Sequence, residues 1–184
     1  MLWHLVSLMR QARPMESTVL IDKHRDQINH ILSKYPDQRS AILPLLYLAQ
    51  KEYGYCTDEA IREVADLVDV EPTHVRSVVG FYTLFYDHPV GKHIIQVCDD
   101  LPCALRGADQ FVDHVCQKLN LDPDKVRHGG QTTDDGQFTV ETVTCIAGCH
   151  HAPLAQIDLD YFENLDEKKF NEIVTRLQNE RAHS

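Results

Sequence analysis

The residues with the clearest capacity for chemistry are cysteines that stand in two close pairs. Cys98 and Cys103 enclose four residues in the segment CDDLPC, and Cys145 and Cys149 enclose three in CIAGC. The N-terminal residues do not match a secretory signal, and in a reducing compartment thiols do not build a disulfide framework. Paired thiols in that setting indicate a metal or redox centre.

Two kinds of metal centre fit this spacing. A [2Fe–2S] cluster takes four thiolates, normally two on each iron, and each short pair can offer two sulfurs to one iron. Pro102, Ala147 and Gly148 suit tight loops around such a group. Structural zinc also takes four cysteines at similar spacing. The chain lacks the Cys-x-x-Cys motif of redox thiols and the Cys-x-x-His of a Rieske centre, and Arg106 stands where a plant-type ferredoxin has its next cysteine. Spacing alone leaves iron–sulfur and zinc both open.

Longer segments around these cysteines resemble a known family. The segments FYTLFYDHPVGKHIIQVCDDLPC, CIAGCHHAP and YFENLDEKKFNEIV are similar to the small [2Fe–2S] subunit of respiratory NADH:quinone oxidoreductase. Similar subunits occur in NAD-reducing hydrogenases and NAD-dependent formate dehydrogenases. The resemblance covers roughly residues 22–180. It implies that Cys98, Cys103, Cys145 and Cys149 are the ligands of one [2Fe–2S] cluster.

The resemblance also implies a function and a partner. The family's partner is a flavoprotein subunit that holds FMN and the NADH site, so we expect single-electron transfer beside that subunit, within an oxidoreductase complex. No residue of this chain is expected to be catalytic, because the sequence has neither a G-x-G-x-x-G nor a phosphate-loop motif. The alternatives are the same role in a formate dehydrogenase or hydrogenase or, from another class, a zinc-stapled interaction module.

The chain departs from the family pattern around its ligands. Thr144 stands where an acidic residue is common, and Asp99 and Asp100 occupy a loop that is commonly rich in threonine. The second loop reads Cys-Ile-Ala-Gly-Cys in place of the usual Cys-Leu-Gly-x-Cys, which puts Ala147 at the usual glycine. These changes leave the ligands intact and bear on the reduction potential.

Four short amphipathic helices are predicted before the first cysteine pair. The first ends at Pro36, and Ser40 can cap a second that stops at Gly54. Thr57 can cap a third helix, and Pro72 opens a fourth.

A different pattern follows from about residue 90. A strand at His93–Val97 runs into Cys98, and an amphipathic helix starts near Gly107. Two further strands, around residues 138–141 and 154–157, precede a helix that Asp166 can cap. The order β-α-β-β-α predicts an α/β sandwich, with a flexible loop between Leu121 and Gln137.

The predicted fold class is therefore α+β, with a helical bundle followed by a domain that the resemblance implies is thioredoxin-like. The predicted divisions are a flexible extension over residues 1–21, the bundle over 22–88 and the [2Fe–2S] domain over 89–184. Residues 1–14 hold no acid and two arginines, which we interpret as an extension, with a mitochondrial presequence as the alternative.

Charge and hydropathy limit the kinds of partner that the chain can bind and its expected location in the cell. The net charge of −10 argues against nucleic acid and favours a basic protein face. No apolar run is long enough to cross a bilayer. We expect a cytoplasmic protein at the periphery of a membrane complex, with the mitochondrial matrix less favoured.

The remaining cysteines and a histidine pair are expected to be structural. Cys116 falls in an amphipathic helix and should pack, whereas Cys56 precedes a helix cap and could be exposed. His150 and His151 follow the second cysteine loop and could couple a proton to reduction, but a solvated polar pair is the favoured interpretation.

Overall fold

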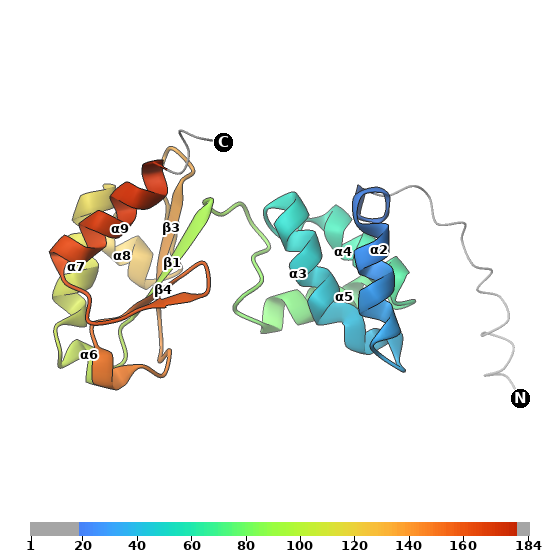
Figure 1. Cartoon of the computed structure of the whole chain (residues 1–184), viewed down its shortest axis with the longest axis horizontal. Coiled ribbons are helices and arrows are strands. Elements are labelled where there is room, and N and C mark those ends of the chain that lie inside the picture. The colour runs from blue at the N-terminus through green and yellow to red at the C-terminus, as the bar shows by residue number, and fades with distance from the viewer. Residues whose placement is uncertain (1–18, 180–184) are drawn as a thin grey trace, which may run out of the picture. The chain divides into compact units, whose positions relative to one another are not determined.

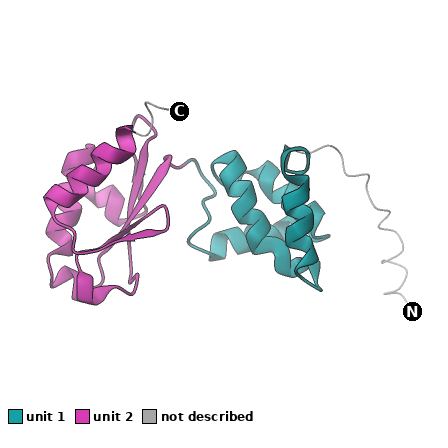
Figure 2. Ribbon diagram, in the orientation of Figure 1, with its two compact units in different colours: residues 1–89 teal, residues 90–184 magenta. Residues whose placement is uncertain are grey.

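The structure, a computed structural model, describes residues 19–179 and divides into two compact units. Figure 2 shows the division, which falls between Pro89 and Val90, one residue from the boundary predicted from sequence. Residues 1–18, and with them most of the predicted extension, lie outside the described residues. Val19–Ile21 were expected in that extension but belong to the first helix.

The first unit is helical throughout its described part. Its elements are α2 Val19–Ser33, the short 3₁₀ helix η1 Gln38–Ala41, α3 Ile42–Tyr53, α4 Asp58–Leu67 and α5 Pro72–Phe81 (Figure 1). Apolar side chains from all four α-helices form one buried cluster. Thr57 caps α4 by accepting from the backbone N–H of Ala60 at 3.0 Å, as predicted. Gly54 ends α3 at φ +83°, a conformation that suits glycine.

The predicted cap at Ser40 is wrong. Asp37 begins this segment instead, accepting from the N–H of Arg39 at 3.0 Å and opening η1. α3 follows directly, with Ala41 at its N-cap position and no side-chain cap. The extra turn of 3₁₀ helix supplies backbone partners that the serine was expected to supply.

A buried carboxylate explains why α2 begins earlier than the sequence suggests. Glu63 of α4 is 5 % exposed, and its two oxygens accept from the N–H groups of Val19 and Leu20, each at 3.2 Å. Tyr53 donates its hydroxyl to the same carboxylate at 2.8 Å, and burial followed by this hydrogen bond raises the pKa of Tyr53. Glu63 thus caps α2 from a distant part of the chain.

Cys56 is buried, contrary to the expectation that it could be exposed. Its side chain is 1 % accessible, and burial raises the pKa of its thiol to about 11. The thiol donates to Oε1 of Gln50 at 3.5 Å, and the same oxygen accepts from the N–H of Tyr86 at 2.9 Å. The backbone N–H of Cys56 donates to the carbonyl of Tyr86 at 2.7 Å. Cys56 and Gln50 together fix the segment that leaves α5.

The second unit is built around a mixed sheet. Its described strands are β1 His93–Cys98, β2 Gln131–Thr132, β3 Phe138–Val143, β4 Ala155–Ile157 and β5 Asp160–Phe162, in the spatial order β2-β3-β1-β4-β5. β1 and β3 are parallel, and the other neighbours are antiparallel. The helices are α6 Leu101–Ala104, α7 Ala108–Leu119, α8 Pro123–Arg127 and α9 Glu167–Asn179, with the 3₁₀ helix η2 at Cys149–His151.

One face of this sheet carries the main core of the unit. Ile95, Val97 and Val140 point from the central strands toward α7 and α9, which lie against each other in Figure 1. Cys116 is fully buried in α7, as predicted. Asp166 accepts from the N–H of Lys169 at 2.7 Å and begins α9, also as predicted.

The segment between Leu121 and Gln137, expected to be a flexible loop, carries regular structure. Asp122 caps α8 by accepting from the N–H of Asp124 at 3.0 Å, and β2 then pairs with β3. Thr139 of β3 is 4 % exposed. Its hydroxyl contacts that of Thr132 at 2.7 Å and accepts from the N–H of Gly91 at 2.6 Å.

The turn after β4 is tied back to the start of β1. Asp158 accepts from the N–H of Ile94 at 2.9 Å and lies 2.6 Å from Nδ1 of the buried His93. These contacts hold the β4–β5 hairpin at the end of β1 opposite Cys98. Within residues 19–179, no helix combines the length and apolar character that crossing a bilayer requires.

Candidate metal centre

The pairing of β1 with β3 brings the two cysteine pairs to one edge of the sheet. Cys98 is the last residue of β1 and lies opposite Val143, the last residue of β3, in the parallel register. Parallel neighbours end at the same edge, so the loop after each strand starts there. Cys103 lies in the first of these loops, and Cys145 and Cys149 lie in the second.

The first loop folds back as the single turn α6. The carboxylate of Asp100 accepts from the N–H of Leu101 at 2.9 Å. The backbone carbonyl of Asp100 accepts from the N–H of Cys103 at 2.8 Å. Cys98 and Cys103 are 1 % and 0 % exposed, and they pack with Ala108, Ala152 and Leu154 in a small separate cluster. Both thiols of the first pair therefore face inward.

The second loop is more open and has an unusual backbone. Cys145 is exposed and Cys149 is half-buried. Cys145 and Ala147 adopt φ values of +53° and +61°, in the left-handed region that side chains with a Cβ disfavour. A Cβ on Gly148 would collide with Cδ1 of Leu154, a side chain with no exposure. The loop therefore needs glycine at position 148 for space and carries strain at position 147.

Hydrogen bonds join the segments that follow the two loops. Nε of Arg106 donates to the carbonyl of Ala152 at 3.1 Å, which ties the end of α6 to the end of η2. The N–H of Asn164 donates to the carbonyl of His151 at 2.7 Å. The Arg106 contact thus joins the ends of the two loops, and the Asn164 contact ties the second loop to the segment before α9; none of these groups is an expected ligand.

The ionisation of the Cys103 thiol is affected by two of the other paired cysteines. The pKa of the Cys103 thiol is raised to about 12 by burial first, then by a hydrogen bond with Cys98 and by the negative charges of Cys98, Cys149 and Asp100. A thiol whose ionisation is opposed in this way suits a cationic group, which would offset the repulsion and displace the proton.

The loops do not form a closed set of ligands in this conformation. Among residues 19–179, no group of three or more His, Cys, Asp or Glu side chains has the arrangement needed to hold a metal ion. Cys145 is exposed on the second loop and is not among the thiols that raise the pKa of Cys103. The donor chemistry nevertheless suits an iron–sulfur group: four thiols on two adjoining loops, two of them buried.

The rings of the two histidines beside the second loop lie close together at a tilted angle. The rings of His150 and His151 are 4.0 Å apart, and Nε2 of His151 lies 3.7 Å from a carboxylate oxygen of Glu163. His150 is exposed. These contacts suit the predicted polar surface pair.

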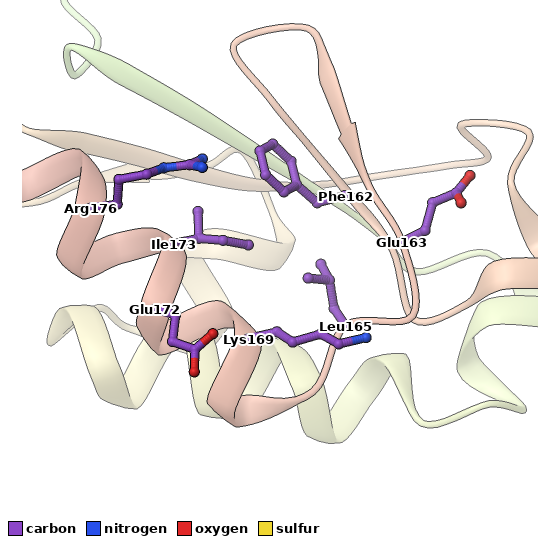
Figure 3. Close-up of a pocket in the computed structure, with 7 residues that line it drawn as sticks. All are labelled: Phe162, Glu163, Leu165, Lys169, Glu172, Ile173 and Arg176. Atoms are coloured by element: carbon purple, nitrogen blue, oxygen red, sulfur yellow. The ribbon is translucent and has the colours of Figure 1, made fainter.

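A groove lies elsewhere in the unit, between β5 and α9. It has a volume of about 380 Å³, and Phe162, Leu165 and Ile173 point toward its centre (Figure 3). Glu163, Lys169, Glu172 and Arg176 complete its lining. Two acidic and two basic side chains give it no net charge, and no cysteine lines it.

Comparison with known proteins identifies the family. Residues 28–178 match the model of the thioredoxin-like [2Fe-2S] ferredoxin family, and the chain belongs to that family. Its fold class is thus the predicted one, and a [2Fe–2S] cluster is the cofactor characteristic of the family.

The curated relatives are components of one kind of enzyme. A subunit of NADH-quinone oxidoreductase from Rhizobium meliloti is 37 % identical over 150 residues, covering 82 % of this chain and 86 % of the relative. Another, NADH-quinone oxidoreductase subunit 2 of Thermus thermophilus, is 36 % identical over 160 residues, covering 85 % of each. The relatives thus belong to an oxidoreductase complex.

A solved structure of a different enzyme shares the fold. An NAD⁺-reducing [NiFe]-hydrogenase in the air-oxidized state matches with a TM-score of 0.62 and 20 % identity, over 74 % of this chain. The match spans 23 % of the hydrogenase chain. At that identity the likeness concerns the fold alone and does not favour the hydrogenase alternative.

Two substitutions at adjacent residues, one that removes a Cβ and one that adds a Cβ, should test the strain and the space assigned to the second loop. Ala147→Gly removes the Cβ from a left-handed residue and should raise the free energy of unfolding. The net gain should be about 0.5–1 kcal/mol, because the entropy that glycine adds to the unfolded chain offsets part of the relief of strain. Gly148→Ala should lower it by about 1–3 kcal/mol, because the new Cβ displaces the buried Leu154. Urea denaturation of both variants measures these changes.

Ala104→Gly is the matched control for the first of these variants. Ala104 lies in α6 without a left-handed backbone, so its replacement should destabilise the chain slightly. Equal effects of Ala147→Gly and Ala104→Gly would contradict the strain assigned to Ala147.

Proposed function

We propose that Cys98, Cys103, Cys145 and Cys149 hold one [2Fe–2S] cluster and that the chain passes single electrons beside an FMN- and NADH-binding flavoprotein subunit. The observation that carries the ligand set is the parallel pairing of β1 with β3, which starts both cysteine loops at one edge of the sheet. The names of the curated relatives favour NADH:quinone oxidoreductase over a hydrogenase or formate dehydrogenase.

The division of labour follows from the chemistry. A [2Fe–2S] cluster, when bound, accepts or donates one electron at a time, whereas NADH gives up a hydride, which is a pair of electrons. The flavin of the partner converts between the two. This chain contributes thiols to bind the irons, an inward-facing first loop that excludes water and an open second loop that leaves the cluster accessible.

The proposal includes a location at the periphery of the membrane complex, on its cytoplasmic side. The relatives belong to a quinone-reducing complex, and none of the described helices could span a membrane. Attachment therefore rests on the partner subunits.

Replacement of each cysteine should separate the ligands from the structural thiols. Ser at position 98, 103, 145 or 149 should abolish the cluster or destabilise it severely, because four thiolates hold two irons with none to spare. Iron content and visible absorption per folded protein measure the outcome. A colourless wild-type protein that contains zinc would instead favour the interaction module.

Cys56→Ser and Cys116→Ser are the controls. Both thiols are buried in hydrophobic clusters that contain none of the paired cysteines, so these variants should keep the iron content and the spectrum of the wild type even where they lose stability. Loss of the cluster in either control would overturn the ligand assignment.

Charge in the first loop should tune the reduction potential. Asp100 already raises the pKa of Cys103, so its carboxylate acts on the thiols electrostatically. Asp99→Asn with Asp100→Asn removes negative charge that disfavours the reduced cluster. The potential should rise by tens of millivolts, which is about 1 kcal/mol for one electron. Asparagine remains a good helix cap, so α6 should persist.

Redox titration followed by visible absorption measures that shift. Asp134→Asn removes one carboxylate near the start of β3, at the opposite end of the sheet, and should shift the potential by much less than half of the shift in the double variant. A lowered potential in the double variant, or equal shifts in both proteins, would contradict the electrostatic explanation.

The isolated chain should depend on its partner for NADH. Loaded with its cluster, it should show no NADH oxidation, because it has no dinucleotide motif and the cluster cannot accept a hydride. Dithionite should reduce it directly if the potential allows. Addition of the flavoprotein subunit should restore NADH-dependent turnover. Strong NADH oxidation by the purified chain, with FMN contamination excluded, would refute this part of the proposal.

A further inference from the structure

Two exposed leucines flank the buried Cys103 on the outer side of α6. Leu101 is 69 % exposed and Leu105 is 80 % exposed, while Cys103 between them is fully buried. Residues four apart lie on the same side of a helical turn, so both leucines face outward where the thiol faces inward. Pro102 between them is also exposed. Leu101, Pro102 and Leu105 are called the leucine patch below.

The fold of α6 does not explain these leucines. Asp100 caps the turn, and the inward contacts come from Cys103. Single exposed leucines are common in soluble proteins, but Leu101 at the start of α6 and Leu105 at its C-cap lie on one side of the turn and form one apolar surface. Such a surface is typical of a contact with another protein.

The position of the patch limits what can cover it. A helical turn of four residues is about 6 Å long, so a protein that covers both leucines comes within about 10 Å of the Cys103 thiol. Electron transfer falls off steeply with distance. A protein on the patch therefore either exchanges electrons with the proposed cluster or blocks exchange along this side.

The charges nearby favour an apolar contact. The chain carries a net charge of −10, and Asp99 and Asp100 directly precede Leu101, yet the three residues of the patch itself are uncharged. The guanidinium of Arg106, the next residue, already donates to the carbonyl of Ala152. Acidic surface elsewhere can guide a partner from a distance, whereas close contact at the patch gains from the removal of apolar area from water.

We propose that the leucine patch is the contact on which the flavoprotein subunit docks, through an apolar surface of its own. This inference rests on the proposed function and adds the residues and the chemistry of the contact. The relatives are subunits of a multisubunit NADH-quinone oxidoreductase, and the patch adjoins the loops that carry the proposed ligands.

The test compares binding to the FMN-bearing subunit of the same complex. Leu101→Gln with Leu105→Gln should keep the visible spectrum of the cluster and weaken binding at least about tenfold, since the apolar gain of burying both side chains is lost. That ratio should be the same at about 0.1 M and 1 M salt, because screening acts on charges. Leu105→Gln alone should show part of the loss.

Leu159→Gln is the matched control. Leu159 is 56 % exposed and adjoins Asp158, which contacts the start of β1, at the end of the sheet opposite the cysteine loops. It should bind like the wild type.

The outcomes separate this inference from the proposed function. No binding by the wild type would overturn both. Wild-type binding with no loss in the double variant, or an equal loss in Leu159→Gln, would overturn the docking contact alone. If the double variant loses its cluster, the cluster-loaded Leu105→Gln decides the question. Sedimentation of the wild type as a dimer, with the variant monomeric, would assign the patch to a second copy and overturn the inference.

Discussion

The parallel pairing of β1 with β3 is the constraint on which the candidate site depends. Cys98 and Val143 are the terminal partners of this ladder, so both cysteine loops begin at the same edge although they are far apart in sequence. Parallel strands need a crossover connection, and α7 and α8 provide it while covering one face of the sheet. The core of the unit is therefore also what brings the starts of the two cysteine loops to one edge.

The two loops contribute differently to the site. The first is short, capped by Asp100 and turned inward, so its thiols are buried, and burial raises the pKa of Cys103. The second leaves Cys145 exposed and its backbone strained. A buried pair and an accessible pair suit a cluster that must be protected from water and yet reachable by a redox partner. Binding of the irons would supply the charge that the crowded thiols lack.

The sequence predicted those features of the fold whose causes are local. The caps at Thr57 and Asp166 and the stop at Gly54 depend on neighbours within a few residues, and all are observed. The failures depend on distant partners. α2 begins where Glu63 reaches it from another helix, and Cys56 is buried because Gln50 and Tyr86 close over it. No local pattern encodes those contacts.

The site shows the same division. The paired spacing and the resemblance predicted the cysteines as ligands, and the register of β1 with β3 explains why their two loops start at one edge of the sheet. Ala147, the departure from the usual glycine of the family, keeps φ at +61° despite its Cβ. The contacts of the residues that follow Ala147 determine its backbone conformation. Gly148 lies against the buried Leu154 and accepts from the N–H of His151, whose carbonyl is held by Asn164. Strain persists where surrounding contacts determine the backbone more strongly than the residue itself, and such strain is typical of functional loops.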